Sequence, residues 1–303
     1  MWTLVSALVA AGLAAAAVYR YWTHAQRVTL VHNATSELIP LLRATCPRLF
    51  ARRFVPTPWM TNGHVQTVFT SVSNALAAFP EVRYVREEVL LPDGGCITLD
   101  WNEGPWEPTT PTLVLLHGLT GGSQEGYIKS TVDAAMRSGV RSVVFNARGC
   151  AGSRLRTSQI FCAAYTDDLR HALAKIRAAV PDSPLVAAGF SLGSNILVKY
   201  LGEEGDRTPL LGAVSLGNPF DLMCAMRRLE EDWLHDLLYN RTLAGNLKRF
   251  YSKYYWSRQG KSFFLKIFSM LFFCEGTRRT SMTPTSTPPT CTAPSPSRSL
   301  TTG

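Results

Sequence analysis

The residues best suited to chemistry form the segment 189–193, GFSLG, which places Ser191 between two glycines in the pattern G-x-S-x-G. The apolar run 184–190 predicts a short strand, and the spacing of apolar residues in 191–202 predicts a helix. A sharp strand-to-helix turn holds a serine hydroxyl exposed at the end of a sheet, where it can act as a nucleophile. Glycines on both sides allow the close backbone approach that this turn requires. The alternative interpretation is a tight turn without chemistry.

A serine nucleophile needs nearby N–H donors that stabilise the negative charge developing on the substrate oxygen. The N–H of Leu192 is one candidate donor, because it belongs to the first turn of the helix after Ser191. The segment 117–122, HGLTGG, ends an earlier apolar run and supplies the second candidate, the N–H of Leu119. We therefore predict an oxyanion hole formed by Leu119 and Leu192, and we expect His117 to orient this loop rather than transfer protons.

Alternating strand and helix patterns surround these two segments. Segments 82–91 and 96–101 alternate apolar and polar residues on either side of a PDGG turn, which predicts a hairpin. Four apolar runs predict strands, the first two of them buried: 111–118, 141–149, 184–190 and 210–219. Three intervening patterns predict helices: 126–138, 165–180 with Thr166 as N-cap, and 191–202. Repeated strand-helix units of this kind indicate an α/β fold with a mostly parallel sheet and helices on both faces.

Six motifs follow one another along the chain: PTPWMTNGHVQT, HGLTGG, VVFNARGCAGS, TDDL, AAGFSLGSN and LYNRTLAGNLKRFYSKY. Together they resemble the AB-hydrolase family four, whose members are membrane-anchored α/β-hydrolases similar to single-pass lipases, phospholipases and yeast medium-chain acyl-ethanol transferases. The resemblance implies an α/β-hydrolase fold with a helical lid, a serine nucleophile at Ser191, and a catalytic aspartate and histidine. It also implies a carboxylic ester hydrolase that acts on lipid esters such as acylglycerols, phospholipids or short- to medium-chain esters.

The catalytic acid and base that the resemblance implies do not occur where this fold places them. In α/β-hydrolases an aspartate or glutamate, and then a histidine, follow the serine along the chain. After Ser191 the only histidine is His235, and the nearby acids Asp221, Asp232 and Asp236 lie in the same helical region. We expect the catalytic Asp and His and the final strands of the fold to be absent, as in a truncated hydrolase. His235 beside Asp236 is the one candidate for a substitute base.

Two functions of different classes are compatible with these residues. The first is a serine ester hydrolase in which Ser191 attacks the ester carbonyl, and water or an alcohol then releases the acyl group. The second is a catalytically dead, membrane-bound pseudo-hydrolase or truncated isoform, which the missing histidine favours. Because a serine without a base is a poor nucleophile, we expect no detectable esterase turnover from these 303 residues.

The N-terminus predicts a membrane anchor. The first 19 residues carry no charged side chain, and Arg20, Tyr21, Trp22 and Arg27 then form an aromatic and basic flank typical of a membrane interface. This pattern predicts a single-pass anchor in the endoplasmic reticulum or another endomembrane; a cleaved signal peptide is the alternative. The positive charges after the span favour a cytosolic main domain.

Charge and cysteine usage exclude several other classes of protein. The net charge of +9 is scattered along the chain without a nucleic-acid-binding signature, so a membrane surface suits it better than nucleic acid. The seven cysteines never form a C-x-x-C pair. No spacing therefore indicates a disulfide framework, a metal site or a cofactor.

These patterns divide the chain into five parts: a membrane anchor 1–27, a connecting segment 28–78, the α/β-hydrolase core 79–217, a helical lid region 218–273 and a disordered low-complexity tail 274–303. The lid region suits either a cover that faces lipid or a helical insertion packed on the core, because both show the same periodicity. The prolines of the tail cannot extend the sheet beyond the strand at 210–219. We therefore expect an exposed apolar sheet edge and poor solubility.

Overall fold

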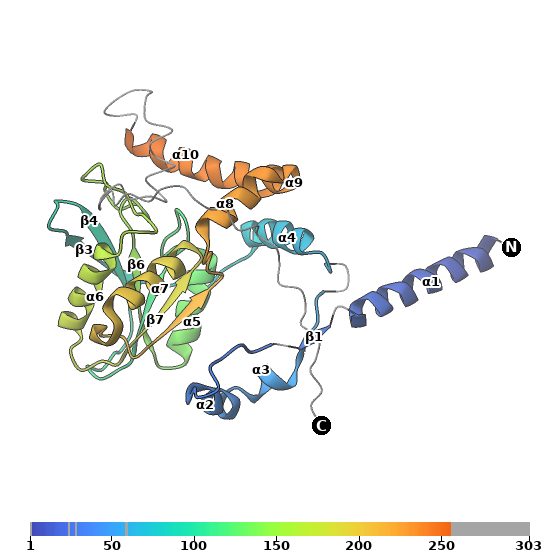
Figure 1. Cartoon of the computed structure of the whole chain (residues 1–303), viewed down its shortest axis with the longest axis horizontal. Helices are drawn as coiled ribbons and strands as arrows, with labels where there is room; N and C mark the ends of the chain where they lie inside the picture. The colour runs from blue at the N-terminus through green and yellow to red at the C-terminus, as the bar shows by residue number, and fades with distance from the viewer. Residues whose placement is uncertain (1, 24, 28, 58–59, 256–303) are drawn as a thin grey trace, which may run out of the picture. The chain divides into compact units, whose positions relative to one another are not determined.

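The computed structural model describes residues 2–23, 25–27, 29–57 and 60–255. Its main feature is a six-stranded sheet. The sheet lies in the second of two compact units, which divide between Ala78 and Phe79. Its strand order is β3-β4-β6-β5-β7-β8. Figure 1 labels β3, β4, β6 and β7 of this sheet. The strands are β3 (Tyr84–Leu90), β4 (Cys96–Asn102), β5 (Thr112–Leu116), β6 (Arg141–Asn146), β7 (Leu185–Phe190) and β8 (Gly212–Leu216).

The sheet is mixed and mostly parallel. The hairpin β3-β4 and the pair β4-β6 are antiparallel, whereas β6, β5, β7 and β8 run parallel to one another. At the centre, Leu115 of β5 lies opposite Val144 of β6 and Ala188 of β7. Because the central strands are buried on both faces, they need the continuous apolar runs seen in the sequence. The predicted hairpin, the four predicted strands and the mostly parallel sheet are confirmed.

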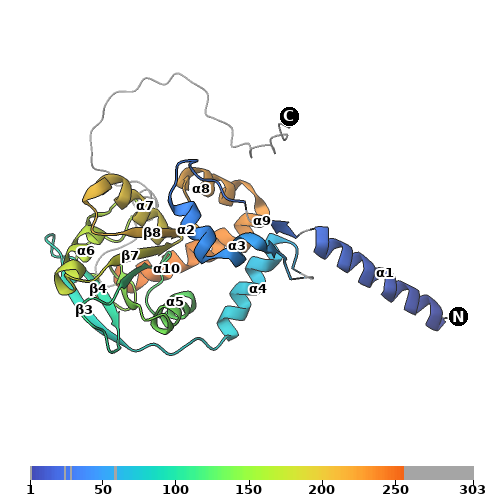
Figure 2. The same ribbon diagram turned by 90° about the horizontal axis from the view of Figure 1, so that it is seen from below.

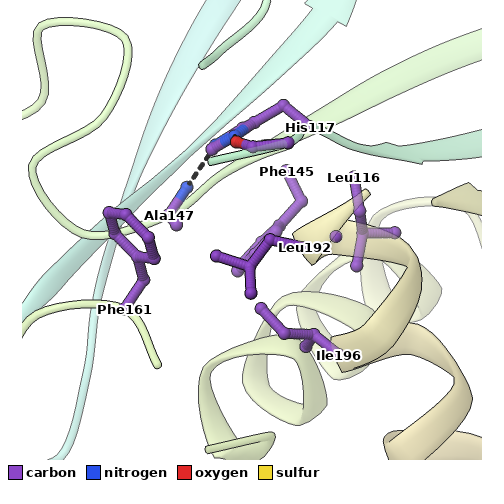
Figure 3. A pocket seen from close by; sticks show the side chains of 9 residues that line it. Leu116, His117, Phe145, Ala147, Phe161, Leu192 and Ile196 are labelled. Atoms are coloured by element: carbon purple, nitrogen blue, oxygen red, sulfur yellow. Dashed lines mark hydrogen bonds between the residues drawn. The ribbon is translucent and has the colours of Figure 1, made fainter. Parts of the chain in front are cut away.

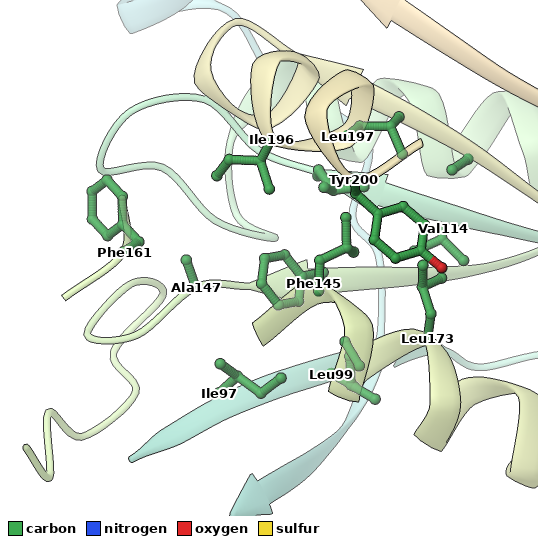
Figure 4. Close-up of a cluster of buried hydrophobic side chains, with 14 of the residues drawn as sticks. Ile97, Leu99, Val114, Phe145, Ala147, Phe161, Leu173, Ile196, Leu197 and Tyr200 are labelled. Carbon is green, nitrogen blue, oxygen red and sulfur yellow. The ribbon is translucent and has the colours of Figure 1, made fainter. Parts of the chain in front are cut away.

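Helices cover both faces of this sheet, as predicted (Figure 2). Successive residues of a strand point to opposite faces, so Leu116 joins one buried cluster and Leu115 the other. The larger cluster packs the sheet against α6 (Asp167–Ala179) and α7 (Leu192–Glu204), and Figure 4 shows part of it, including Val114, Leu173 and Leu197. The smaller cluster packs the other face against α5 (Gly126–Arg137).

The N-terminal end of α6 differs from the prediction in one detail. Thr166 occupies the N-cap position, but its side chain makes no capping hydrogen bond. Its hydroxyl instead donates to the carboxylate of Glu203 at the end of α7. The hydroxyl is held by this tertiary contact, which ties the two helices together, and is therefore not available for the local cap.

Helices α8 (Leu222–Glu231), α9 (Trp233–His235) and α10 (Arg241–Tyr255), with the π-helical turn η2 (Asp236–Asn240), follow the sheet and belong to the same unit. A short 3-10 turn, η1 (Gly205–Arg207), lies earlier, between α7 and β8. Helix α10 packs on the core: Leu247 is buried, and the ring of Phe250 contacts that of Phe161 at 5.4 Å between centroids. The basic and aromatic segment 261–273 and the tail 274–303 lie outside the described residues.

Strand β8 is the last strand among the described residues, and within them it pairs only with β7. All five of its residues are exposed. Val214 is 55% exposed and Leu216 is 41% exposed. The apolar edge expected from the sequence is therefore present in the described chain, and its effect on solubility stays a prediction.

The first unit contains α1 (Trp2–Thr23), β1 (Gln26–Arg27), α2 (Leu38–Thr45), α3 (Pro47–Ala51), β2 (Arg53–Phe54) and α4 (Gly63–Leu76). Strands β1 and β2 form a two-residue antiparallel pair. The segment Val5–Thr23 of α1 is long and apolar enough to cross a membrane. Several of its apolar side chains are exposed, including Val9 at 56% and Leu13 at 67%. Asn62 caps the start of helix α4, because its side chain accepts hydrogen bonds from the N–H groups of His64 and Val65.

Candidate active site

Ser191 occupies a strained turn between β7, which ends at Phe190, and α7, which begins at Leu192. Its φ of 51° and ψ of −118° are unusual for a residue with a side chain. The Ser191 N–H donates to the carbonyl of Leu216 at 2.9 Å, and its carbonyl accepts from the N–H groups of Ser194 and Asn195. These bonds fix the backbone of Ser191 while the residue itself stays exposed. The serine is thus presented at the end of the sheet.

Two other residues share the positive φ of Ser191. Among the described residues, Ser191, Thr120 and Ala151 are the non-glycine positions with positive φ. Thr120 belongs to the loop after β5, and Ala151 belongs to the loop after β6 and packs against Gly122. Sites of chemistry are where such strain concentrates, so the three positions mark the carboxyl end of the parallel strands as the candidate active site.

The loop HGLTGG lies beside Ser191. A Cβ placed on Gly118 would be 3.4 Å from the Cβ of Ser191, which is ordinary contact. The Gly118 carbonyl accepts hydrogen bonds from His117 Nδ1 at 2.7 Å and from the Gly121 N–H at 3.1 Å. In a trans peptide the N–H points opposite the carbonyl, so these two bonds fix the direction of the Leu119 N–H. The role of the Leu119 N–H as an oxyanion donor stays a prediction.

His117 connects two loops rather than facing the serine. Its Nε2 accepts the N–H of Ala147, at the end of β6, at 3.2 Å, which assigns the ring proton to Nδ1 and makes that atom the donor to Gly118. The ring is buried, and burial lowers the pKa of His117, so it stays neutral. The structure therefore gives His117 the orienting contacts that the sequence interpretation expects.

Leu192 starts α7, so its N–H has no acceptor within the helix. Its side chain is 7% exposed and lines a small apolar cavity of about 10 Å³ together with His117, Phe145, Phe161 and other residues (Figure 3). This volume matches roughly one water molecule. The side chain anchors the start of the helix in the core, which holds its N–H next to Ser191.

Tyr127 of α5 is a site residue that the sequence analysis missed. Its hydroxyl oxygen accepts the Gly118 N–H at 2.9 Å, and its ring packs on Phe190 with 4.9 Å between centroids. Burial raises the pKa of Tyr127, so it remains a neutral hydroxyl. Tyr127 touches both halves of the site, the loop and the residue before Ser191. No sequence signal marks it, because its partners are distant along the chain.

A second missed group holds the far end of the same loop. Ser123 is buried; its N–H donates to Asn146 Oδ1 at 3.0 Å, and its hydroxyl donates to the carboxylate of Asp100. Asp100 also accepts from Asn146 Nδ2 and from the guanidinium of Arg86. Burial raises the pKa of Asp100, but the bonds from Arg86 and Ser123 outweigh it and hold the pKa below its usual range. Asp100 is thus an ionised anchor for this loop.

Tyr127 should act as a positioning residue, and Tyr127→Phe tests this. The variant keeps the ring on Phe190 but leaves the Gly118 N–H without its acceptor, which costs about 1–3 kcal/mol. We expect the reaction of Ser191 with a fluorophosphonate probe to slow by about tenfold. Tyr84→Phe is the control, because the Tyr84 hydroxyl donates to the Ser123 carbonyl of the same loop, farther from Gly118. Equal slowing in both variants would mean that Tyr127 only stabilises the fold.

His235, the candidate for a substitute base, pairs with an acid three residues earlier in the chain. Its Nδ1 lies 3.2 Å from Asp232 Oδ2, whereas Asp236 is bound to Asn240 and Arg241. Adjacent residues of a helix point in different directions, while residues three apart share a face.

Within the described residues 2–23, 25–27, 29–57 and 60–255, no hydrogen bond joins a histidine to Ser191. The sequence itself contains no histidine after His235. The same described residues contain no group of three His, Cys, Asp or Glu side chains that could hold a metal ion.

The chain matches a known protein family over the region that contains this site. Residues 111–264 match the family described as alpha/beta hydrolase fold. The chain belongs to this family. The matched region of this α/β hydrolase begins just before β5 and contains Ser191 and the HGLTGG loop.

Curated relatives of this α/β hydrolase come from plants, fungi and animals. Embryogenesis-associated protein EMB8 of Picea glauca is 38% identical over 206 residues, covering 65% of this chain and 44% of that protein. Medium-chain fatty acid ethyl ester synthase/esterase 2 of Saccharomyces cerevisiae is 33% identical over 260 residues, covering 66% and 57%. Phospholipase ABHD3 of Homo sapiens is 34% identical over 219 residues, covering 70% and 52%. The chain spans about half the length of these relatives.

Proposed function

We propose that this α/β hydrolase has the nucleophile and oxyanion site of a serine ester hydrolase that acts on lipid esters. The observation that carries the proposal is the strained turn at Ser191, in contact with Gly118 of the HGLTGG loop. The names of the yeast esterase and the human phospholipase support a lipid ester as the substrate class. They also support the resemblance to AB-hydrolase family four.

The proposed reaction is acyl transfer through Ser191. Its Oγ attacks the ester carbonyl carbon, and the N–H groups of Leu119 and Leu192 stabilise the oxyanion. Collapse of the tetrahedral intermediate expels the alcohol, which takes up a proton, and leaves an acyl-serine. Water then releases the fatty acid, or a second alcohol accepts the acyl group to give a new ester.

A base must take the proton from Ser191 before this attack is fast. Because no hydrogen bond joins a histidine to Ser191 in the described chain, we propose that these 303 residues have a formed but slow nucleophile. Free imidazole in solution should then act as the missing base and accelerate Ser191. The second candidate function, a non-catalytic lipid-binding protein, is favoured by the same missing contact.

The test is covalent labelling with a fluorophosphonate probe. We expect slow labelling that added imidazole accelerates and that Ser191→Ala abolishes. Ser138→Ala, at an exposed serine after α5, is the control and should label as the unmodified chain does. Labelling that persists in Ser191→Ala would falsify the assignment of the nucleophile. Labelling that imidazole fails to accelerate would favour the non-catalytic function.

We propose that α1 anchors the hydrolase in a membrane, where its substrates reside. The support is the length and hydropathy of Val5–Thr23 and the exposure of its apolar side chains. Fractionation distinguishes this anchor from a signal sequence: an anchored chain resists alkaline carbonate extraction and retains Met1 to Thr23. Recovery of a soluble chain that lacks this segment would contradict the anchor.

A further inference from the structure

A groove of about 370 Å³ lies at the end of the sheet opposite Ser191. Arg141, the first residue of β6, and Asn102, the last residue of β4, line it. Strands β6 and β7 are both parallel to β5, so the start of β6 and the end of β7 at Ser191 lie at opposite ends of the sheet. The groove is therefore separate from the candidate active site.

Arg141 is a buried cation without a carboxylate. Its residue is 7% exposed, and its one side-chain hydrogen bond runs from Nη2 to the Glu107 carbonyl at 2.7 Å. Within the described residues its Nη1 has no partner and no acid lies within ion-pair distance. Arg148, also buried, is instead paired with Asp168 and Asp93. A buried charge without a counter-charge is costly, so the Arg141 guanidinium would be stabilised by an anion.

Asn102 adds a second unused donor to the same groove. It is 3% exposed, and its Oδ1 accepts the Ser142 N–H at 2.6 Å. That bond identifies the remaining amide atom as the nitrogen, and Nδ2 has no acceptor among the described residues. Each unsatisfied buried donor costs about 1–3 kcal/mol. Both unpartnered groups are donors, which an oxyanion would satisfy.

The acidic residue in the groove is already neutralised. Glu87 accepts the Trp101 Nε1–H at 3.1 Å and pairs with Lys175 at 3.0 Å. Arg177, in the last turn of α6, donates to the carbonyls of Pro181, Ser183 and Pro209, which lie in the loops after α6 and before β8. The negative charge of Glu87 is therefore compensated by Lys175.

Two indole rings give the groove an apolar side. Trp101 and Trp106 are half-buried, and Trp106 Nε1–H donates to the Asn102 carbonyl at 3.0 Å. The Trp106 ring also rests on Gly104, where a Cβ would come within 2.5 Å of it. The indoles are held in place and offer flat apolar surface next to the unpartnered donors.

We propose that this groove binds a small organic anion, with its carboxylate or phosphate group on Arg141 and Asn102 and its flat apolar body against Trp106. The guanidinium fork suits the oxygens of either group. The site does not depend on Ser191, so it would exist whether or not the chain hydrolyses esters.

The test measures binding of four probes to the full chain in detergent micelles by calorimetry. Benzoate and phenyl phosphate carry the two oxyanions on a flat body, benzamide lacks the charge, and inorganic phosphate lacks the body. We expect saturable binding of benzoate and phenyl phosphate, and the tighter of the two identifies the head group. Binding of benzamide as tight as that of benzoate, or no saturable binding of either anion, would overturn the proposal.

Two variants and two controls complete the test. Arg141→Met should weaken anion binding by about tenfold or more. Asn102→Asp keeps the acceptor for Ser142 but adds a carboxylate to the groove, so it should abolish binding and raise the melting temperature. Arg137→Met, at an exposed arginine of α5, and Ser191→Ala should bind as the unmodified chain does. Unchanged binding in Asn102→Asp would refute the site even if Arg141→Met failed to fold.

Discussion

Gly193→Ala is expected to slow the labelling of Ser191 by about 100-fold and to cost about 3 kcal/mol of stability. A Cβ on Gly193 would lie 2.4 Å from the carbonyl oxygen of His117 and 2.7 Å from that of Leu116. Both atoms are backbone at the end of β5, so neither can turn aside as a flexible side chain could. The start of α7 would have to move away from β5, and Ser191 and the N–H of Leu192 would move with it.

Gly202→Ala is the matched control on the same helix. Gly202 is exposed in α7, and a Cβ there would meet nothing within 4 Å. This variant should gain about 0.5–1 kcal/mol, because alanine costs less entropy than glycine in a helix. Labelling rates and chemical denaturation of the two variants give the comparison. If Gly193→Ala labelled as fast as Gly202→Ala, the turn would not require close approach of α7 to β5.

The strands and helices of the core could be predicted because their signals are local. The apolar runs that became β5, β6 and β7 fill the part of the sheet that is buried between two layers, and the run that became β8 forms its exposed edge. Amphipathic spacing predicts α5, α6 and α7. The turn at Ser191 was also local, since its glycines and its strand-helix context lie within twenty residues. The family resemblance added the fold that these elements build, an α/β hydrolase, which the family match confirms.

The hydrogen bonds that hold the HGLTGG loop in place could not be predicted, because they join residues far apart in sequence. Ser123 reaches Asp100 and Asn146 across 23 residues each, and Asn146 reaches Asp100 across 46. Such pairs depend on strand order and register, which no local pattern specifies. The pairing of His235 with Asp232 is different, because helical geometry alone favours a partner three residues away over the adjacent Asp236.

Asp168→Asn is expected to cost about 3–5 kcal/mol of stability, a large share of the roughly 5–15 kcal/mol that holds a typical domain together. Arg148 is 1% exposed and lies just after β6, and its Nε and Nη2 each donate to one Asp168 oxygen at 2.7 Å. In the variant one of these oxygens becomes an N–H₂ group that faces another donor. The remaining carboxylate partner, Asp93, is 39% exposed and contacts only Nη1.

Asp167→Asn is the control, because it makes the same substitution at the neighbouring aspartate of the TDDL motif, which is exposed rather than buried. Asp167 is 51% exposed and pairs with Arg170 on the surface of α6, so Asp167→Asn should cost about 1 kcal/mol or less. Chemical denaturation of both variants measures the difference. The destabilisation by Asp168→Asn should persist at high salt, because a buried pair is screened far less than an exposed one. Equal costs for the two asparagines would show that Arg148 does not need Asp168. The loop after β6, which packs Ala151 against Gly122 beside the candidate active site, would then be held by other contacts.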